Sequence, residues 1–292
     1  MYCMITGATS GLGLAIFERL LQTSDYNFII FGRNSERLDQ LKKRSNANQR
    51  DCITFTVDFA EPEHDRKIAD SLKTLQKQIV IDYLIFAAAH LNNQPFSNLE
   101  SSAIVNALNC NINSIVSLTY QMMPYLTRQP SRVLVISSVS GFYGVPNSSL
   151  YSGSKAFLLR FFESLNIELT AADIKISVFC PGAFKKNGRP IRREEDALPK
   201  NHVVKVTKLQ FISNIVNFIR SPFDFFAQLK ISKPMCVDHV ASAALHYSLY
   251  GTSPIKIYDK RNLLATILIV LAGSTNRLAL FKRRFKNQKK QG

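Results

Sequence analysis

The chain has 292 residues, enough for one large α/β domain with its own core. Five scattered cysteines, an odd number, argue against a disulfide framework, and no metal-ligand spacing accompanies them, so we expect no metal site. The formal net charge of +16 favours polyanionic partners, yet no nucleic-acid motif is present and we expect no nucleic-acid binding. A glycine-rich stretch begins at Thr6 and leaves no room for a secretory leader, so we expect a cytoplasmic protein.

Seven apolar runs are candidate strands, and helix-period stretches alternate with them. The runs cover residues 2–5, 28–31, 53–57, 81–87, 132–137, 175–180 and 255–258. The clearest helical stretches are 99–128, the segment from Tyr151 onward, and 237–249. This alternation predicts a single doubly wound α/β domain with about seven parallel strands and helices on both faces of the sheet.

The first apolar run leads into a glycine-rich turn and then an amphipathic helix. The turn supplies the candidate cofactor-binding residues Thr6, Gly7, Ser10, Gly11, Leu12 and Gly13. Glycines let the backbone turn tightly and approach a pyrophosphate, and the following helix presents free N–H groups to that anion. The spacing is GxxxGxG, which differs from the GxGxxG of the generic dinucleotide fingerprint.

The second apolar run ends in Gly32-Arg33. An acidic residue at this point would hold the ribose hydroxyls of NAD, whereas a guanidinium matches a 2′-phosphate with two hydrogen bonds. Arg33 therefore predicts NADP(H) as the cofactor.

Three polar side chains follow the fifth apolar run within eighteen residues: Ser138, Tyr151 and Lys155. If Tyr151 opens a helix, Lys155 lies one turn further on the same face. A phenol with a pKa near 10 is a poor acid or base at neutral pH, and an adjacent ammonium lowers that pKa toward the working range. Ser138 ends a strand and would hold a carbonyl oxygen. The three groups suit the reduction of a carbonyl.

Together the TGxxxGxG turn and the Ser138, Tyr151 and Lys155 set resemble the short-chain dehydrogenase/reductase family, over roughly residues 2 to 260. The resemblance implies that Asp58 meets the adenine edge. It also implies that Asn111 holds a water linking Lys155 to solvent, which completes the catalytic set.

Two departures from the family pattern lie at the expected cofactor site. Residues 86–89 read Phe-Ala-Ala-Ala where the family has Asn-Asn-Ala-Gly, although Ala88 still allows close cofactor approach. After Pro181 and Gly182, a threonine that meets the cofactor carboxamide is missing, and backbone atoms would substitute for it. These departures keep open a non-catalytic nucleotide-binding scaffold or regulator as an alternative function.

Residues 183–236 form a long segment, called the excursion below, between the sixth apolar run and the helical stretch 237–249. In the family this region covers the substrate. Its second half is rich in Phe, Ile and Leu, which predicts a lipophilic carbonyl substrate: long-chain 3-oxoacyl, sphingoid or steroid-like. Packing of these side chains on each other is the alternative. A second alternative is a carrier-bound 3-oxoacyl substrate, because residues 185–193 are basic and would meet an acidic carrier protein.

We assign residues 1–260 to the dinucleotide-binding and catalytic domain and 261–292 to a C-terminal extension. The apolar run 263–272 has roughly ten residues against the ~20 needed to span a bilayer. Because basic residues follow it, we expect peripheral membrane contact through 263–290. The apolar helix after Lys155 is the segment through which the family commonly dimerises, so the resemblance implies a homodimer.

Overall fold

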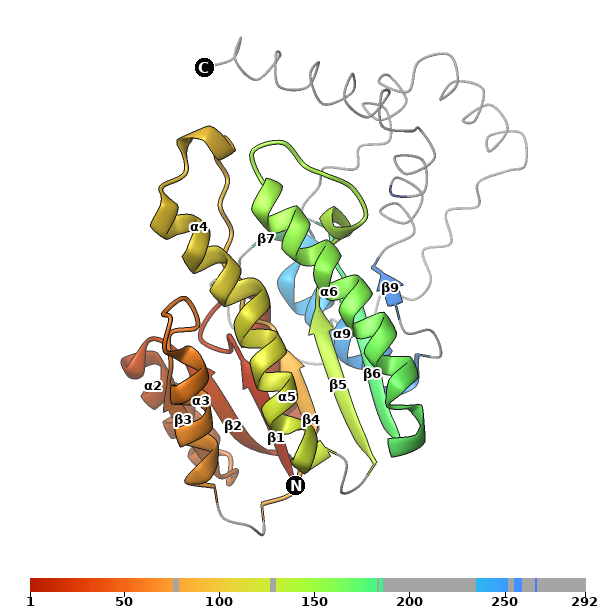
Figure 1. The fold of residues 1–292 in the computed structure, drawn as a ribbon. Helices are drawn as coiled ribbons and strands as arrows, with labels where there is room; N and C mark the ends of the chain where they lie inside the picture. The colour runs from red at the N-terminus through yellow and green to blue at the C-terminus, as the bar shows by residue number, and fades with distance from the viewer. Residues whose placement is uncertain are drawn as a thin grey trace, which may run out of the picture.

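The structure is a computed structural model, and it describes residues 1–75, 79–126, 130–182, 184–185, 235–251, 255–258 and 266. A seven-stranded sheet with the order β3-β2-β1-β4-β5-β6-β9 lies at the centre (Figure 1). Every neighbouring pair in it is parallel. The strands are β1 (Tyr2–Thr6), β2 (Asn27–Gly32), β3 (Cys52–Thr56), β4 (Ile81–Phe86), β5 (Ser131–Ile136), β6 (Ile174–Cys180) and β9 (Ile255–Ile257).

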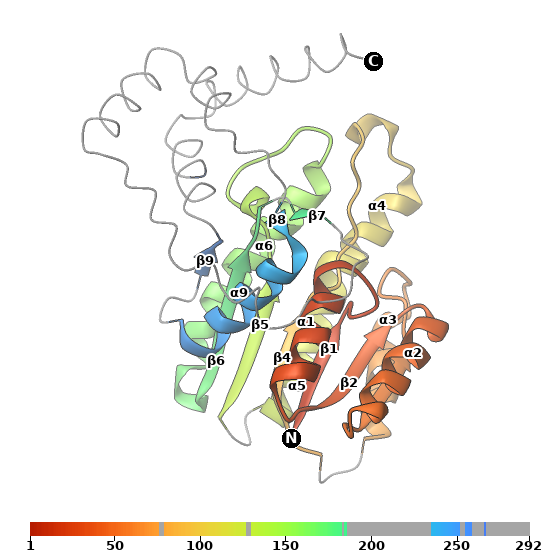
Figure 2. The same cartoon turned by 180° about the vertical axis from the view of Figure 1, so that it is seen from behind.

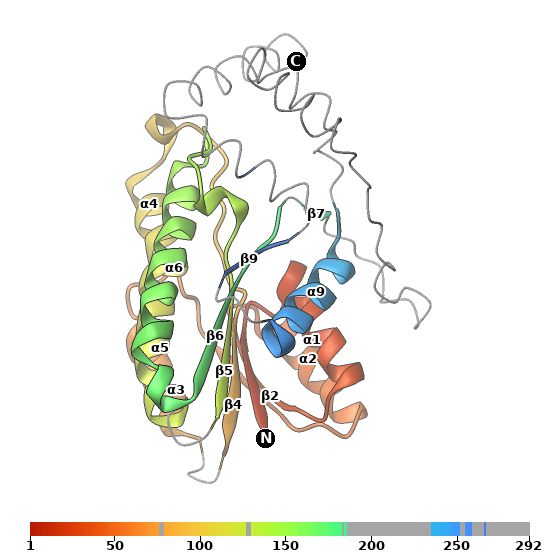
Figure 3. The same ribbon diagram turned by 90° about the vertical axis from the view of Figure 1, so that its right-hand side faces the viewer.

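Helices cover both faces of the sheet, which Figure 3 shows edge-on. One face carries α1 (Gly11–Thr23), α2 (Ser35–Ala47) and α9 (Val237–Tyr250). The other carries α3 (His64–Lys73), α4 (Ser101–Leu108), α5 (Ser114–Leu126) and α6 (Ser149–Glu168). The predicted doubly wound α/β fold is confirmed.

The strands were predictable because each is buried on both sides. In β2, Phe28 and Ile30 pack into the core under α1 and α9, while Ile29 and Phe31 pack into the core under α3 and α5. Central strands of a parallel sheet therefore appear as continuous apolar runs instead of alternating patterns. The seven predicted runs match the observed strands to within about one residue at most ends.

The prediction of one helix over 99–128 needs a correction. The structure has α4, then a π turn over Asn109–Asn113, then α5. A π turn adds a residue to one helical turn without changing which residue types face the core, so the apolar period cannot show it.

The excursion between residues 183 and 236 leaves and returns at one place. Strand β7 (Phe184–Lys185) pairs in parallel with β8 (Met235–Cys236), and β8 runs directly into α9 (Figure 2). The predicted apolar cover within the excursion lies outside the described residues. So does the C-terminal extension, apart from Thr266.

Cys3, Cys52 and Cys180 are buried free thiols. Among the helices that the structure describes, none combines the length and apolarity that crossing a membrane requires.

Candidate active site

A cleft opens at the carboxyl edge of the sheet, where β1 and β4 are neighbours and the chain turns outward in opposite directions. This is the switch point at which doubly wound sheets bind ligands. Most of the predicted site residues line it: Gly7, Ser10, Gly11, Leu12, Arg33, Asp58, Ala88, Ser138, Tyr151, Lys155, Pro181 and Gly182. Thr6, Gly13 and Asn111 are placed one layer behind the lining and support it.

The glycine-rich turn is shaped by close backbone contacts. Gly7 has a φ of +74° and Gly11 a φ of +56°, a conformation that favours glycine. A Cβ on Gly7 would lie 2.6 Å from the nitrogen of Ala88, and one on Gly13 would lie 2.2 Å from the oxygen of Gly7. The turn is therefore packed against the segment that follows β4 on one side and against the first turn of α1 on the other, which leaves a bare backbone surface at the N-terminus of α1.

Thr6 joins this turn to the segment that departs from the family pattern. Its hydroxyl accepts hydrogen bonds from the N–H groups of Ala87 and Ala88, both at 3.3 Å. Phe86 turns into the core instead, where its ring centroid lies 5.8 Å from that of Phe162. The backbone at Ala88 is thus held without the two amides of the family pattern.

The far end of the cleft is basic and contains one carboxylate. Arg33 is exposed just after β2, and Arg37, one helical turn into α2, reaches the carbonyl of Thr9 at 3.4 Å. Asp58 is half-buried, and its Oδ1 accepts from the N–H of Ala60 at 3.0 Å. The two guanidinium groups beside the glycine turn can donate hydrogen bonds to a phosphate, and the fixed carboxylate can accept a hydrogen bond from an exocyclic amine.

The catalytic candidates converge at the other end of the cleft. Tyr151 lies in the first turn of α6, as predicted, and the Nζ of Lys155 lies 5.5 Å from the centre of its ring. Lys155 Nζ donates to the carbonyl of Ile136 at 2.8 Å and is buried. Ser138 Oγ accepts from the N–H of Ser140 at 3.2 Å and from its hydroxyl at 2.9 Å. Since both acceptor positions of Ser138 are engaged, its own proton is left to donate.

The protonation of these groups differs from the sequence expectation. Burial raises the pKa of the Tyr151 phenol, and a hydrogen bond with Ser138 opposes the rise. The lowering of that pKa by Lys155, which the sequence predicts, is not among the causes of this shift. The pKa of Lys155 itself is lowered by burial to about 8, and the ionisable Cys110 and Cys180 side chains act weakly in the opposite direction. The arrangement keeps the phenol protonated at neutral pH, the state required of a proton donor.

Asn111 lies in the π turn and is almost fully buried. Its side chain makes two hydrogen bonds to the main chain of one residue: Oδ1 accepts from the N–H of His90 at 2.7 Å, and Nδ2 donates to the carbonyl of His90 at 2.8 Å. The amide is therefore committed to the loop after β4. Any water that Asn111 holds would be held through its main chain.

Several residues of the cleft were missed by the sequence argument. Arg37, which contacts Thr9 of the lining, had a signal only as a second arginine four residues after Arg33. Ser140 also had one, in the Ser-x-Ser spacing with Ser138. Cys110 and His90 line the cleft with no feature of the local sequence to announce them.

The residues present fit a dinucleotide. The backbone cradle, which a Cβ at Gly7 or Gly13 would fill, and the helix N-terminus beside it match a pyrophosphate. The two guanidinium groups match a ribose phosphate, and the carboxylate matches an adenine. The phenol, amine and hydroxyl at the opposite end are placed for proton transfer to a carbonyl oxygen.

A doubly wound sheet with a glycine-lined cleft at its switch point fits a dinucleotide-binding protein, and sequence comparison is more specific. The family model described as short chain dehydrogenase matches residues 2–196, so the chain belongs to the short-chain dehydrogenase family, whose members use NAD(P)(H) and act on CH–OH and C=O groups.

Curated relatives are distant. The 3-oxoacyl-[acyl-carrier-protein] reductase FabG of Thermotoga maritima is 25% identical over 224 residues, which are 75% of this chain and 89% of that protein. The very-long-chain 3-oxoacyl-CoA reductase-B of Danio rerio is 28% identical over 62% of this chain and 58% of its own length. The 11-beta-hydroxysteroid dehydrogenase of Pinus massoniana is 26% identical over 68% and 56%.

Solved structures agree on the fold. A 7beta-hydroxysteroid dehydrogenase superposes with a TM-score of 0.71 at 18% identity, covering 96% of this chain and 95% of its own. A short-chain dehydrogenase from Sphingobium yanoikuyae in complex with NADPH gives 0.67 at 19% identity, covering 99% and 95%.

Proposed function

We propose that this protein uses NADPH to reduce a carbonyl group of a lipophilic substrate to an alcohol. The observation that carries the proposal is the joint lining of one cleft by the glycine turn and Arg33 at one end and by Ser138, Tyr151 and Lys155 at the other. A cofactor stretched along this cleft would reach from the basic end to the phenol.

Each side chain has a role in that reaction. NADPH, when bound, supplies the hydride. The Ser138 hydroxyl, whose acceptor positions are taken by Ser140, turns its proton from Tyr151 to the carbonyl oxygen when substrate binds, and the Tyr151 phenol donates its proton to that oxygen as negative charge develops. The Lys155 amine, beside the phenol, binds ribose hydroxyls and returns a proton to Tyr151. The main chain of Asn111 holds the water that connects Lys155 to solvent.

The choice of NADPH rests on Arg33, which lines the end of the cleft, and on Arg37, which contacts the carbonyl of Thr9 beside it. We expect Arg33→Ser to lower NADPH affinity by about 10- to 100-fold, because charge-assisted hydrogen bonds contribute about 1.5–3 kcal/mol. NADH affinity should stay within about twofold, since NADH carries no 2′-phosphate. The chain has no tryptophan, so both affinities are read from the emission of the reduced nicotinamide itself.

Arg66→Ser serves as the matched control, because Arg66 is an exposed arginine on α3 that pairs with Glu63. Wild-type protein that binds neither cofactor would contradict the proposed function as a whole. Equal affinities of the wild type for NADPH and NADH would contradict only the cofactor preference.

The lipophilic substrate class is supported by the mouth of the cleft and by the relatives. Leu91 lines the cleft with 62% of its surface exposed, and Phe184 lines it at the start of the excursion. The names of two relatives refer to very-long-chain 3-oxoacyl-CoA and to 11-beta-hydroxysteroids. Turnover of a steroid ketone or a long-chain 3-oxoacyl thioester, with little turnover of a short hydrophilic ketone, is the expected result.

A carrier-bound 3-oxoacyl substrate is the second candidate, and the name of the Thermotoga maritima relative favours it. The basic residues 185–193 that would meet the carrier lie outside the described residues, apart from Lys185. Salt-sensitive turnover of a carrier-linked substrate would select this candidate. A protein that binds NADPH but turns over no carbonyl would instead select the scaffold or regulator.

We further propose that a second copy of the chain covers α6. Leu158 and Phe162 are buried against the sheet, whereas Phe157 is 38% exposed and stacks on Phe161 with their ring centroids 5.6 Å apart. The rings border a shallow hollow that also includes Leu165. Phe157→Glu is expected to convert a dimer to a monomer in light scattering, because it places a charge in an apolar interface.

Tyr120→Glu on α5 is the control for that variant, since Tyr120 is 79% exposed and lies away from the hollow. A wild-type protein that is already monomeric at micromolar concentration would exclude the dimer. The membrane contact through 263–290 remains a proposal, which flotation of the full chain with anionic vesicles would test. The cytoplasmic location is a separate proposal.

A further inference from the structure

The π turn at Asn109–Asn113 contacts two loops of the cleft at once. Successive helical residues are about 100° apart, so Asn109 and Asn111 point to nearly opposite sides, with Cys110 between them. Cys110 lines the cleft itself. Asn109 and Asn111 are 7% and 1% exposed, and each binds a main-chain group of a different loop.

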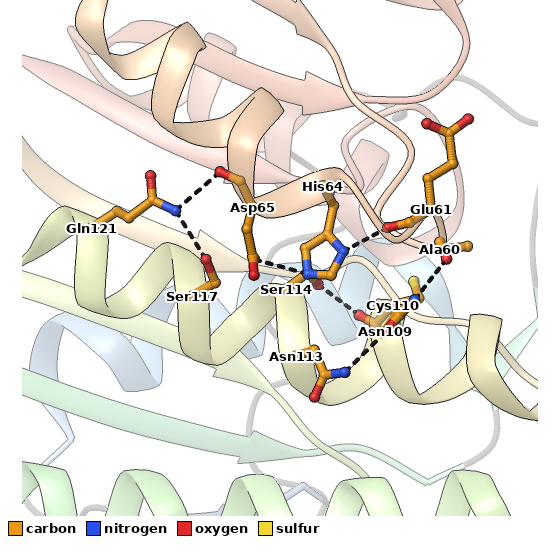
Figure 4. A network of polar contacts seen from close by, with 10 residues as sticks. All are labelled: Ala60, Glu61, His64, Asp65, Asn109, Cys110, Asn113, Ser114, Ser117 and Gln121. Carbon is orange, nitrogen blue, oxygen red and sulfur yellow. Dashed lines mark hydrogen bonds and ion pairs between the residues drawn. The ribbon is translucent and has the colours of Figure 1, made fainter.

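Asn109 binds the loop that follows β3. Its Nδ2 donates to the carbonyl of Ala60 at 3.0 Å (Figure 4). The N–H of the same Ala60 donates to Asp58 Oδ1 at 3.0 Å, and the N–H of Glu61 donates to the carbonyl of Asp58 at 3.2 Å. Hydrogen bonds to the main chain of Ala60 therefore connect the Asn109 amide to the Asp58 carboxylate, which lines the cleft.

The orientation of the Asn109 amide is fixed by a neighbour. Its Oδ1 accepts from Nδ2 of Asn113 at 2.9 Å, so its NH₂ group must face Ala60 (Figure 4). The far side of the loop is held by His64, which is buried: Nδ1 lies 2.7 Å from the carbonyl of Glu61 and Nε2 lies 3.0 Å from Asp65 Oδ1. Asn109 and His64 thus both hold this loop. Of the two, only Asn109 lies in the π turn that also carries Asn111.

Asn111 holds the second loop through the two hydrogen bonds to His90 described above, and His90 lines the cleft beside Ala88 and Ala89. The same π turn consequently sets the position of the adenine-side carboxylate and of the loop behind the nicotinamide side. π turns of this kind are frequent at functional sites, because the extra residue redirects side chains that a regular helix would align differently.

We propose that Asn109 is a positioning residue for the cofactor: it acts through Ala60 to hold the Asp58 carboxylate at the adenine end of the cleft. This inference rests on the proposed function, because it assumes that a dinucleotide occupies the cleft. It differs from a purely structural role, in which Asn109 would stabilise the folded chain without affecting the affinity of folded protein for the adenine half of the cofactor.

The test uses Asn109→Asp, which keeps the shape of the side chain but turns a carboxylate oxygen toward the Ala60 carbonyl. Asn106→Asp is the matched control, since Asn106 is exposed on α4 and the charge change is the same. Binding is measured for NADPH, for 2′,5′-ADP as its adenine half, and for reduced nicotinamide mononucleotide as the other half. Asn109→Ala replaces Asn109→Asp if the latter fails to fold, as judged by circular dichroism.

We expect Asn109→Asp to weaken 2′,5′-ADP and NADPH by about tenfold, the equivalent of one hydrogen bond, and the nicotinamide half by less than twofold. In the Asp58→Ala background the same change should have little further effect, because the carboxylate it positions is gone. Unchanged 2′,5′-ADP affinity of folded Asn109→Asp, or full additivity with Asp58→Ala, would overturn the inference while leaving the proposed function intact. Failure of the wild type to bind NADPH would overturn both.

Discussion

Replacement of Tyr151 by phenylalanine is expected to lower the turnover of a carbonyl substrate by about 10²–10⁴-fold, the usual contribution of a positioned general acid. The change removes only the hydroxyl at the first turn of α6, which hydrogen-bonds with Ser138 and whose pKa is raised by burial. NADPH affinity should change by no more than a few-fold, because the glycine turn and Arg33 are untouched. Steady-state kinetics and nicotinamide emission measure the two quantities separately.

Tyr120→Phe is the control, because that tyrosine is 79% exposed on α5 and lies outside the cleft lining. It should behave like the wild type in both assays. A Tyr151→Phe protein that keeps most of its turnover would remove Tyr151 from the proton path, and the proposed mechanism would fail with it.

Substitution of Lys155 by methionine is expected to change how stability depends on pH. Burial lowers the pKa of Lys155 to about 8 in the folded protein, whereas an unfolded chain has a pKa near 10.5. Between these values the unfolded state binds more protons, so the free energy of unfolding rises with pH. At about 1.4 kcal/mol per pH unit, the rise amounts to about 3 kcal/mol across the window, and Lys155→Met should lack it.

Urea unfolding followed by circular dichroism at several values between pH 7.5 and pH 10.5 measures this difference. Loss of the hydrogen bond to the Ile136 carbonyl shifts the variant's stability by a constant and leaves its slope unaffected. Buried thiols and phenols that do not interact with Lys155 contribute equally to both proteins and cancel in the comparison. Lys155 lowers the pKa values of Cys110 and Cys180, but burial holds these values at about 11 and about 12, above the measured window. Parallel curves for the two proteins would mean that Lys155 titrates alike in the folded and unfolded states.

The fold was largely predictable because its strands and turns depend on local chemistry. Buried parallel strands require apolar runs, and the tight turn at Gly7 and Gly13 requires residues without a Cβ, so both features are visible in the sequence. The π turn was not predictable, because no residue type specifies it. It follows from the packing of Asn109 and Asn111 against two loops that are distant in sequence.

The site was predictable in membership more than in detail. Spacing alone placed Tyr151 and Lys155 on one turn of a helix. It could not show that the amine of Lys155 donates to Ile136, that burial raises the pKa of Tyr151, or that Ser140 occupies both acceptor positions of Ser138. Each of these depends on tertiary burial or on a loop conformation, neither of which a linear pattern encodes.

The short pairing of β7 with β8 has a consequence for how such a protein can diversify. Because the pair fixes both ends of the excursion beside Gly182 and at the start of α9, chain length between them can change with little effect on the sheet below. Each doubling of a flexible loop costs only about 0.6 kcal/mol. Natural variation or protein engineering can therefore change the length and sequence of the excursion while the seven-stranded sheet and the cleft at its edge stay the same.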